Sequence, residues 1–504
     1  MKEKIRYSIL FLLAVVLAGC SPYNAPTNTP TDTPKDSLTN HPKDSLTNHP
    51  TDNPTDNTNP SQHRDQEYLY DLAAVPEIRL TFTEEDWNTY LSNYDKNKDN
   101  TIYVPAAFSF TKDGQTFVRD SVGVRPRGNT SRHRPEGEYG QKHNAENTDW
   151  HHCHFGVKFT EYASGERFFG SDRVVLKYFN GDPAYCREIF CYDLFRRFGV
   201  WSAPRASYCR LYIHVQGDAK PAYFGVYAMI EGVRNGWRDG RYKDGKLPDK
   251  TGNLWKAAYN SNGPADLSDF NAGGINKMGV ADDEHAYSYA LKTNKKNLSA
   301  AQQELVDFME QMRPLSSGSD ALKSYLEEHM DVDLFLRYLA VNVAVGMWDD
   351  YWVNANNYYF YFDQNHRFYF IPYDYDNTLG TSKPINGMQD SGKQDPLNWG
   401  SRGGDRLLVR KVLSIPAFEE TYKSYLKTIV TDPEYMEPDA AIARIQTLQN
   451  LVKDYVRNDT GTEMTITDQT RRDDGDKEYC LLTGGNDGSA FSNYFRTKAA
   501  SVYW

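Results

Sequence analysis

The chain has 504 residues, a formal net charge of −11 and 14% aromatic residues, including 36 Tyr. This length allows a sizeable core, either in two or three domains or in one large two-lobed unit. The acidic balance and the absence of a basic stripe disfavour nucleic acid as a partner.

The first twenty residues have the pattern of a secretory signal. A basic start is followed by an apolar run from Ile9 to Leu17, which is too short for a stable membrane span. The run ends in Leu-Ala-Gly-Cys20, which resembles the bacterial lipobox, where lipid is attached to the Cys thiol before cleavage. We therefore expect residues 1–20 to be a lipoprotein signal peptide, with Cys20 as the lipidation site and the membrane as a partner through that lipid. A cleaved signal with an incidental Cys is the alternative.

Residues 21–66 consist mainly of Thr, Pro, Asn, Asp and Ser, and the octapeptide Pro-Lys-Asp-Ser-Leu-Thr-Asn-His occurs twice in tandem. Such a segment cannot bury enough apolar surface to offset its chain entropy. We expect a disordered tether that holds the globular part away from the lipid surface. The predicted location is the cell envelope, extracytoplasmic, on the periplasmic face or at the cell surface.

The first half of the globular part is predicted to be β-rich, over about residues 67–260. Alternating apolar residues predict a strand at 77–82, and Thr83 is placed to cap a following helix. One further helix is predicted around Arg187–Phe198. The other expected strand segments are Tyr103–Val118, His154–Thr160, Val174–Phe179 and Tyr208–Ile230.

The hydrophobic period becomes helical beyond about Asn297, and this half extends to residue 504. The helices expected here are Ala300–Met312, Asp320–Met330, Asp333–Val345 and Ile415–Thr431. A β-rich part followed by a mostly helical part predicts a two-lobed α+β architecture for residues 67–504.

Carboxylates and amides are concentrated in residues 347–380, at two chain reversals around a predicted aromatic hairpin. Phosphoryl transfer requires a carboxylate near the incoming hydroxyl and oxygen ligands for a divalent cation. Protein kinases space their catalytic Asp and Asn as D-x-x-x-x-N, and a metal-binding Asp follows in D-F-G. Asp349 and Asn354 have this spacing, and Asp-Tyr-Asp at 374–376 stands where D-F-G would. Because Asp and Asn are also common in turns, the spacing alone leaves a turn-only interpretation open.

Several basic residues of the β-rich half are candidates for holding phosphate. Arg127 lies in a glycine-flanked segment that is nearly a Walker A loop, but Asn129 replaces its lysine, which disfavours a P-loop NTPase. Lys158 and Lys177 lie in predicted strands, and Glu231 ends another. A strand lysine paired with an acid holds the α and β phosphates in kinases. A charged hairpin turn and solvated strand lysines are the structural alternatives.

Two segments that resemble metal-binding motifs lack the residues that such sites need. Residues 95–106 begin like a calcium loop, but the sixth position lacks Gly and the twelfth is Ala106 instead of Glu. The run His-His-Cys-His at 151–154 has no partner cluster at zinc spacing, which favours a structural role. Six Cys are present, and if Cys20 is acylated, at least one of the remaining five has no intrachain partner.

Taken in order, the motifs resemble those of the CotH family, the spore-coat and secretory-pathway atypical kinases. The resemblance covers roughly residues 75 to 500. It rests on Val124–Ser131, Gly225–Glu231, Asn253–Lys256, Trp348–Tyr361 and Ile371–Asp376, with Thr378 and Gly380.

This resemblance implies an atypical protein-kinase-like fold that uses ATP and Mg²⁺ or Mn²⁺. By position, Asp349 is the expected catalytic residue, and Asn357, Asp374 and Asp376 are the expected metal ligands. The loop after Trp348 is two or three residues longer than the usual pattern, so Asp349 versus Asp350, and Asn354 versus Asn357, remain open.

The function expected from these observations is phosphate transfer from ATP to Ser or Thr of an unknown extracytoplasmic protein, or of the enzyme itself. Transfer to a saccharide would use the same site. The alternative from another class is a non-catalytic envelope or surface protein of kinase-like fold that binds glycan or a partner protein through its aromatic surface.

Overall fold

The computed structural model describes residues 66–128, 131–146, 149–268, 274–281, 286–380, 391–400, 406–461, 466 and 493–504. Cys20, the predicted signal peptide, all but the last residue of the predicted tether, Asn129 and Cys480 lie outside the described residues. The chain is 35% helix and 23% strand, which confirms the α+β class. Among the described residues, no helix combines the length and apolar character needed to cross a bilayer.

Seven strands of the N-terminal part form a closed barrel in the order β1-β2-β3-β4-β5-β7-β6. The sequence predicted the strands but not the closure, which comes from the parallel pairing of β1 with β6. The strands are β1 (Glu77–Phe82), β2 (Val104–Lys112), β3 (Gln115–Arg127), β4 (His154–Lys158), β5 (Arg173–Tyr178), β6 (Ala206–Val215) and β7 (Ala222–Glu231).

Local sequence explains the first turns of the barrel. In β1, the buried residues alternate with partly exposed ones, as a strand with one face in a core requires. Thr83 caps α2 (Glu84–Lys96) by accepting a hydrogen bond from the backbone N–H of Asp86, as predicted. The β2–β3 hairpin turns at Asp113 and Gly114, both at positive φ, which suits a tight two-residue turn.

A second sheet of five strands has the order β12-β11-β8-β10-β9. The predicted aromatic hairpin is confirmed as the antiparallel pair β11 and β12. The strands are β8 (Asn253–Ala257), β9 (Met278–Gly279), β10 (Tyr289–Leu291), β11 (Tyr358–Phe362) and β12 (Phe368–Pro372).

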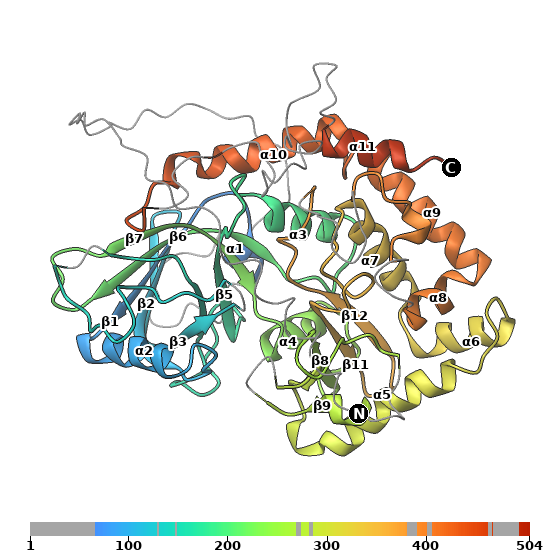
Figure 1. The fold of residues 1–504 in the computed structure, drawn as a ribbon, viewed down its shortest axis with the longest axis horizontal. Coiled ribbons are helices and arrows are strands. Elements are labelled where there is room, and N and C mark those ends of the chain that lie inside the picture. Colours follow the sequence, from blue (N-terminus) through green and yellow to red (C-terminus); the bar gives the residue numbers. More distant parts are fainter. Residues whose placement is uncertain are drawn as a thin grey trace, which may run out of the picture. The chain divides into compact units, whose positions relative to one another are not determined.

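The helices predicted from periodicity are confirmed to within about two residues at their ends. Figure 1 shows the barrel strands in blue to green and helices α5 to α9 in yellow to orange beside the second sheet. Besides α2, the helices are α1 (Gln66–Tyr70), α3 (Arg187–Arg197), α4 (Asn235–Lys243), α5 (Leu298–Met312), α6 (Asp320–His329), α7 (Val332–Ala344), α8 (Leu407–Leu413), α9 (Pro416–Thr431), α10 (Pro438–Val452) and α11 (Tyr494–Ser501).

Helix α7 positions the loop that carries the acidic motif. It is buried on nearly all sides, and its side chains pack in the larger of two apolar clusters. After its C-terminus the chain turns at Gly346, where φ is +70°, and a Cβ there would lie 2.4 Å from the Tyr494 hydroxyl. The turn therefore requires Gly and fixes the start of the loop at Met347.

Candidate active site

Lys177, near the end of β5, lies at the centre of a cluster of three carboxylates. Its Nζ lies 2.6 Å from Glu188 Oε2 on α3 and 3.5 Å from Asp376 Oδ2, and it donates a hydrogen bond to Asp374 Oδ1. The strand residues before Lys177 are mostly apolar and buried, and the Lys177 side chain is itself only 11% exposed. The structure thus brings together Lys177, Asp374 and Asp376, three of the predicted residues.

The surroundings shift the pKa values of Glu188 and Asp374 in opposite directions. Burial and the nearby Asp374 and Asp376 raise the pKa of Glu188 to about 8, against the opposing effect of Lys177. Burial also acts to raise the pKa of Asp374, but Lys177, Lys256 and Arg127 lower it overall. Asp374 is therefore ionised at neutral pH. Its side chain is still 34% exposed, so its oxygens remain accessible.

Asp349 lies in the loop between α7 and β11, where three side-chain amides surround its carboxylate. Asn354 and Asn356 donate to Oδ1 over 2.6 and 3.1 Å, and Asn357 donates to Oδ2 over 2.9 Å. Asn357 and Ala355 adopt positive φ, so the loop doubles back to present these amides. Both predicted asparagines, Asn354 and Asn357, therefore orient Asp349.

The two acidic motifs act on each other electrostatically. Burial raises the pKa of Asp349 to about 7, and the charges of Asp374 and Asp376 contribute to that rise, while the Asn354 and Asn356 amides oppose it. A carboxyl with a pKa near neutral pH is suited to exchange a proton.

Asp350 has different surroundings, although it is the next residue. It is 1% exposed, and its carboxylate accepts hydrogen bonds from Asn342 Nδ2 at 2.6 Å, the Tyr338 hydroxyl at 3.2 Å and the backbone N–H of Val353 at 2.9 Å. These partners belong to α7 and to the loop itself. The geometry therefore assigns Asp350 to holding the loop on α7 and leaves Asp349 facing the carboxylate cluster.

Two further cations lie near Asp374. Lys256 on β8 and Arg127 at the end of β3 both lower its pKa. Arg127 Nη2 lies 3.4 Å from the Tyr373 hydroxyl, and the Lys256 ammonium lies 5.8 Å from the centroid of the Tyr373 ring. Arg127 is thus brought to the site as predicted, and Lys256 joins it from the second sheet.

Two predicted nucleotide-binding residues lie elsewhere. Glu231 is buried, and its Oε2 accepts hydrogen bonds from Arg241 Nη2 at 2.8 Å and from the backbone N–H of Arg205 at 3.0 Å. Lys158 pairs with Glu161 at 2.5 Å. Neither contacts Lys177, whose acidic partner is Glu188. The sequence offered a weak signal for Glu188, because it opens the first helix after the Lys177 strand, as the paired Glu does in kinases.

The histidine run has a structural environment. His154 accepts a hydrogen bond from the backbone N–H of Tyr178 through Nδ1 and stacks on the Tyr178 ring, with centroids 4.5 Å apart. His152 Nε2 lies 2.8 Å from the Phe224 carbonyl oxygen. Among the described residues, Cys153, Cys191 and Cys209 are free cysteines, and these three and Cys186 are buried. Across the same ranges, no three His, Cys, Asp or Glu side chains are grouped to hold a metal by themselves.

The oxygen donors of Asp374 and Asp376 nevertheless fit a magnesium ion. Mg²⁺ usually takes one or two protein carboxylates and completes its coordination with substrate phosphates and water. Both carboxylates are partly exposed, and Asn357 supplies an amide oxygen next to Asp349. The donor set therefore suits a cation that arrives together with a phosphate ligand.

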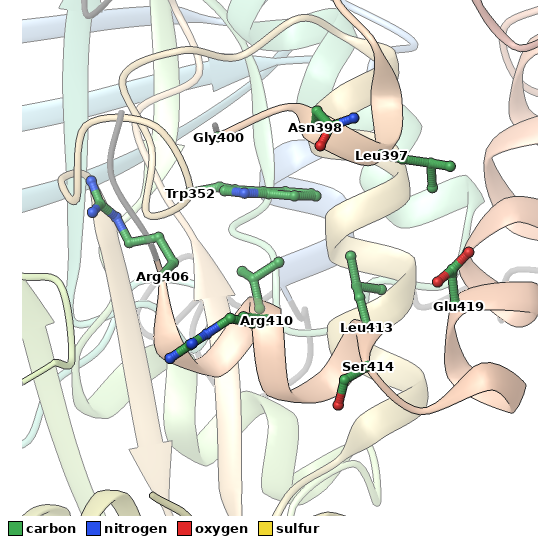
Figure 2. A pocket seen from close by; sticks show the side chains of 10 residues that line it. Trp352, Leu397, Asn398, Gly400, Arg406, Arg410, Leu413, Ser414 and Glu419 are labelled. Atoms are coloured by element: carbon green, nitrogen blue, oxygen red, sulfur yellow. The ribbon is translucent and has the colours of Figure 1, made fainter. Parts of the chain in front are cut away.

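A cavity of about 490 Å³ is lined by Trp352, which belongs to the loop that carries Asp349, and by residues between 397 and 419 (Figure 2). None of the predicted site residues lines it. Trp352 and Leu413 contribute apolar walls, and Arg410 and Glu419 contribute charge. At its edge, Arg406 donates from Nε to the Tyr351 carbonyl at 2.9 Å and from Nη2 to the Val353 carbonyl at 2.7 Å. Arg406 therefore fixes the back of the loop that carries Asp349.

Comparison with known proteins identifies similar chains. The sequence profile of the family described as CotH kinase protein matches residues 124–494. Spore coat protein homolog 1 of Rhizopus delemar is 22% identical over 369 residues, which is 72% of this chain and 52% of the relative. Invasin CotH7 of the same organism is 24% identical over 368 residues, 72% of this chain and 53% of the relative. The chain thus spans about half the length of these curated relatives.

Proposed function

Because this chain belongs to the CotH kinase protein family, we propose that it is an atypical kinase that transfers phosphate from ATP to a Ser or Thr hydroxyl. The acceptor is an extracytoplasmic protein or the enzyme itself. The observation that carries the proposal is the contact of Lys177 with both Glu188 and Asp374. Protein kinases need a strand lysine paired with a helix glutamate and a metal-binding Asp after the catalytic loop.

The two parts of the chain contribute different elements to this site. The barrel supplies Lys177 and Arg127, and helix α3 supplies Glu188. The segment around the second sheet supplies Asp349, Asp374, Asp376 and Lys256. This division supports a kinase-like arrangement, in which a β-rich part holds phosphates above a part that carries the acidic residues.

In the proposed reaction, the acceptor oxygen attacks the γ-phosphorus of ATP, the bond from that phosphorus to the β,γ-bridging oxygen breaks, and ADP leaves. Asp349 accepts the proton of the attacking hydroxyl. Its three amide neighbours hold the carboxylate in one orientation, and its pKa of about 7 leaves a large ionised fraction at neutral pH. Lys177 and Arg127 neutralise phosphate charge, while Glu188 holds the Lys177 ammonium in place.

A divalent cation bound with ATP would supply charge neutralisation across the β and γ phosphates. Asp374 and Asp376 would hold it, with Asn357 as a further oxygen donor. In the structure the Lys177 ammonium contacts both carboxylates. We propose that the carboxylates turn from that ammonium toward the cation when the nucleotide binds.

The proposed setting is the cell envelope. The Leu-Ala-Gly-Cys20 motif and the polar segment 21–66 support a lipid-anchored protein whose catalytic part acts outside the cytoplasm. This setting determines the class of acceptor, which must be an exported or surface protein.

A non-catalytic surface role is the second candidate, and the names of the relatives favour it. Of the two relatives described above, one is named an invasin and the other a spore coat protein homolog. In that case the kinase-like site would be a retained scaffold, and the protein would bind glycan or a partner protein.

Titration calorimetry of the purified protein with ATP and Mg²⁺ or Mn²⁺ separates the two candidates. The kinase proposal predicts metal-dependent binding that is lost in Asp374→Asn and kept in Asp349→Asn, since only the former holds the cation. Absence of binding at millimolar nucleotide would favour the non-catalytic role.

A further inference from the structure

A large basic cavity lies apart from the carboxylate cluster and is used by nothing described so far. Its volume is about 830 Å³, and it lies where strands β3, β4 and β5 meet the N-terminal end of α4 and the segment after β10. Its lining includes seven Lys or Arg residues and two carboxylates, a formal excess of five positive charges. The chain as a whole has a net charge of −11, so the excess of positive charge is a local feature of this cavity.

The barrel side of the cavity places like charges next to each other. Arg125, Lys158 and Arg173 come from three adjacent strands, and Lys158 and Arg173 are direct cross-strand neighbours. Like charges in that position destabilise a sheet. The two acidic lining residues, Glu161 and Asp172, pair with Lys158 and Arg173, so they offset only part of this repulsion.

The half-buried phenol of Tyr103 responds to the electrostatic potential on this side. The Arg125 guanidinium and the Lys158 ammonium lie 5.3 and 5.4 Å from the centroid of the Tyr103 ring. Burial acts to raise the pKa of Tyr103, but Arg173, Arg125 and Arg127 lower it overall. The cavity is therefore positive enough to favour an anion in spite of burial.

Two other segments add four cations to the lining. Arg234 and Arg238 come from the start of α4, and Lys292 and Lys295 follow β10. Arg238 also pairs with Asp239 at 2.8 Å. The barrel and these two segments therefore contribute cations to one cavity, and a ligand with one negative charge would offset only a small part of their charge. Guanidinium groups are matched to phosphate oxygens.

This cavity is separate from the phosphate end of the proposed ATP site. Arg173 and Lys177 lie four residues apart on β5, which places their Cα atoms about 13 Å apart on the same face of the strand. The cavity lining contains none of Lys177, Asp349, Asp374 or Asp376. The lining is also unlike the mostly apolar wall of a pocket for a neutral organic ligand.

We propose that this cavity binds a small polyanion, a molecule that carries two or more phosphate groups, as a second ligand beside the kinase site. This inference goes beyond the proposed function and does not depend on it, because it requires neither metal nor phosphoryl transfer. The barrel cations bind one end of the polyanion, and the cations of α4 and of the segment after β10 bind the other.

The test is titration calorimetry of the full-length protein with inorganic tripolyphosphate, without divalent metal, at low ionic strength. We expect saturable binding that weakens steeply with salt, and at least tenfold weaker binding of inorganic phosphate. Lys295→Glu should weaken tripolyphosphate binding at least tenfold, whereas Lys296→Glu, the same change at the next residue and outside the cavity, should change it less than twofold. Both positions are exposed, so both variants should fold.

A double variant, Lys158→Gln with Arg173→Gln, tests the barrel side, and thermal unfolding reports whether it is folded. Arg127→Gln removes a charge outside the lining and should weaken tripolyphosphate binding less than the double variant does. The proposal is overturned if tripolyphosphate does not bind, if inorganic phosphate binds as tightly, or if Lys295→Glu and Lys296→Glu have equal effects. It is also overturned if Arg127→Gln weakens binding while the double variant does not, because the ligand would then occupy the Lys177 cluster.

Discussion

The ammonium of Lys177 on β5 lies 2.6 Å from a carboxylate oxygen of Glu188 on α3. Both side chains are buried, and Lys177 also contacts Asp374. This pair connects the barrel, the helix that follows β5 and the segment after β12. It places a lysine with three carboxylate partners close to the loop that carries Asp349.

Replacing the Glu188 carboxyl group, which pairs with Lys177, should lower the rate of phosphoryl transfer more than the stability of the fold. In Glu188→Gln, Lys177 loses the carboxyl oxygen that lies 2.6 Å from its ammonium but keeps Asp374 and Asp376, so its ammonium is drawn toward the cation site. We expect phosphoryl transfer to fall about 10- to 100-fold. Asp193→Asn on the same helix is the control, because Asp193 pairs with Arg197 and Arg444 away from the site. Rates of autophosphorylation are the measurement, and equal rates in both variants would remove Glu188 from the site.

The two adjacent aspartates should respond oppositely to the same change. Asp350→Asn places an amide N–H₂ among donors that need an acceptor, so we expect a loss of about 1–3 kcal/mol in unfolding free energy. Asp349→Asn should abolish transfer without lowering the unfolding free energy, because its amide neighbours can reorient. Urea unfolding and transfer assays on both variants measure this. If Asp350→Asn is as stable as wild type but inactive, then Asp350 and not Asp349 is the catalytic residue.

The raised pKa of Asp349 predicts a specific pH dependence of stability. The folded protein holds this proton up to about pH 7, whereas the unfolded chain releases it near pH 4, so stability falls as pH rises through this window. Asp349→Asn lacks this loss. Without metal we expect the variant to exceed wild type by about 1–2 kcal/mol at pH 8, after allowance for partial solvent screening, and to match it near pH 4. Parallel unfolding curves at pH 5 and 8 check this, and an equal difference at both values would contradict it.

Metal should stabilise the folded protein through Asp374. Adding millimolar Mg²⁺ with ATP is expected to raise the melting temperature of wild type by a few degrees, because the ligand binds only the folded state. Asp374→Asn should show no metal-dependent increase, whereas Asp71→Asn, an exposed acid paired with Lys112, should behave like wild type. A full shift in Asp374→Asn would exclude this residue as a metal ligand.

Most helices and the aromatic hairpin were predictable, because they depend on residues near each other in sequence. Alternation in β1, the Thr83 cap and the period of α5 to α7 are local signals. Barrel closure was not predictable, because it depends on the parallel pairing of β1 with β6, strands separated by most of the barrel. The kinase-like interpretation of the fold remains a proposal.

The site was predictable where motifs were local and not where partners were distant. Spacing located the two acidic motifs that contain Asp349, Asp374 and Asp376, but it left Asp349 versus Asp350 open. Lys158 and Lys177 could not be separated, because both are strand lysines and only tertiary packing places Lys177 against the cluster. For the same reason Glu231 was chosen as the paired acid and Glu188 was missed, yet Glu231 pairs with Arg205 and Arg241.

The central claim is that the Lys177 and Asp349 groups together perform phosphoryl transfer. Its most direct measurement is the transfer of label from γ-labelled ATP to the protein itself or to added acceptor, with Mg²⁺ or Mn²⁺ present. The account predicts incorporation by wild type, loss of at least a hundredfold in Asp349→Asn and Asp374→Asn, and wild-type incorporation in Asp71→Asn. Equal incorporation in all four proteins would contradict it.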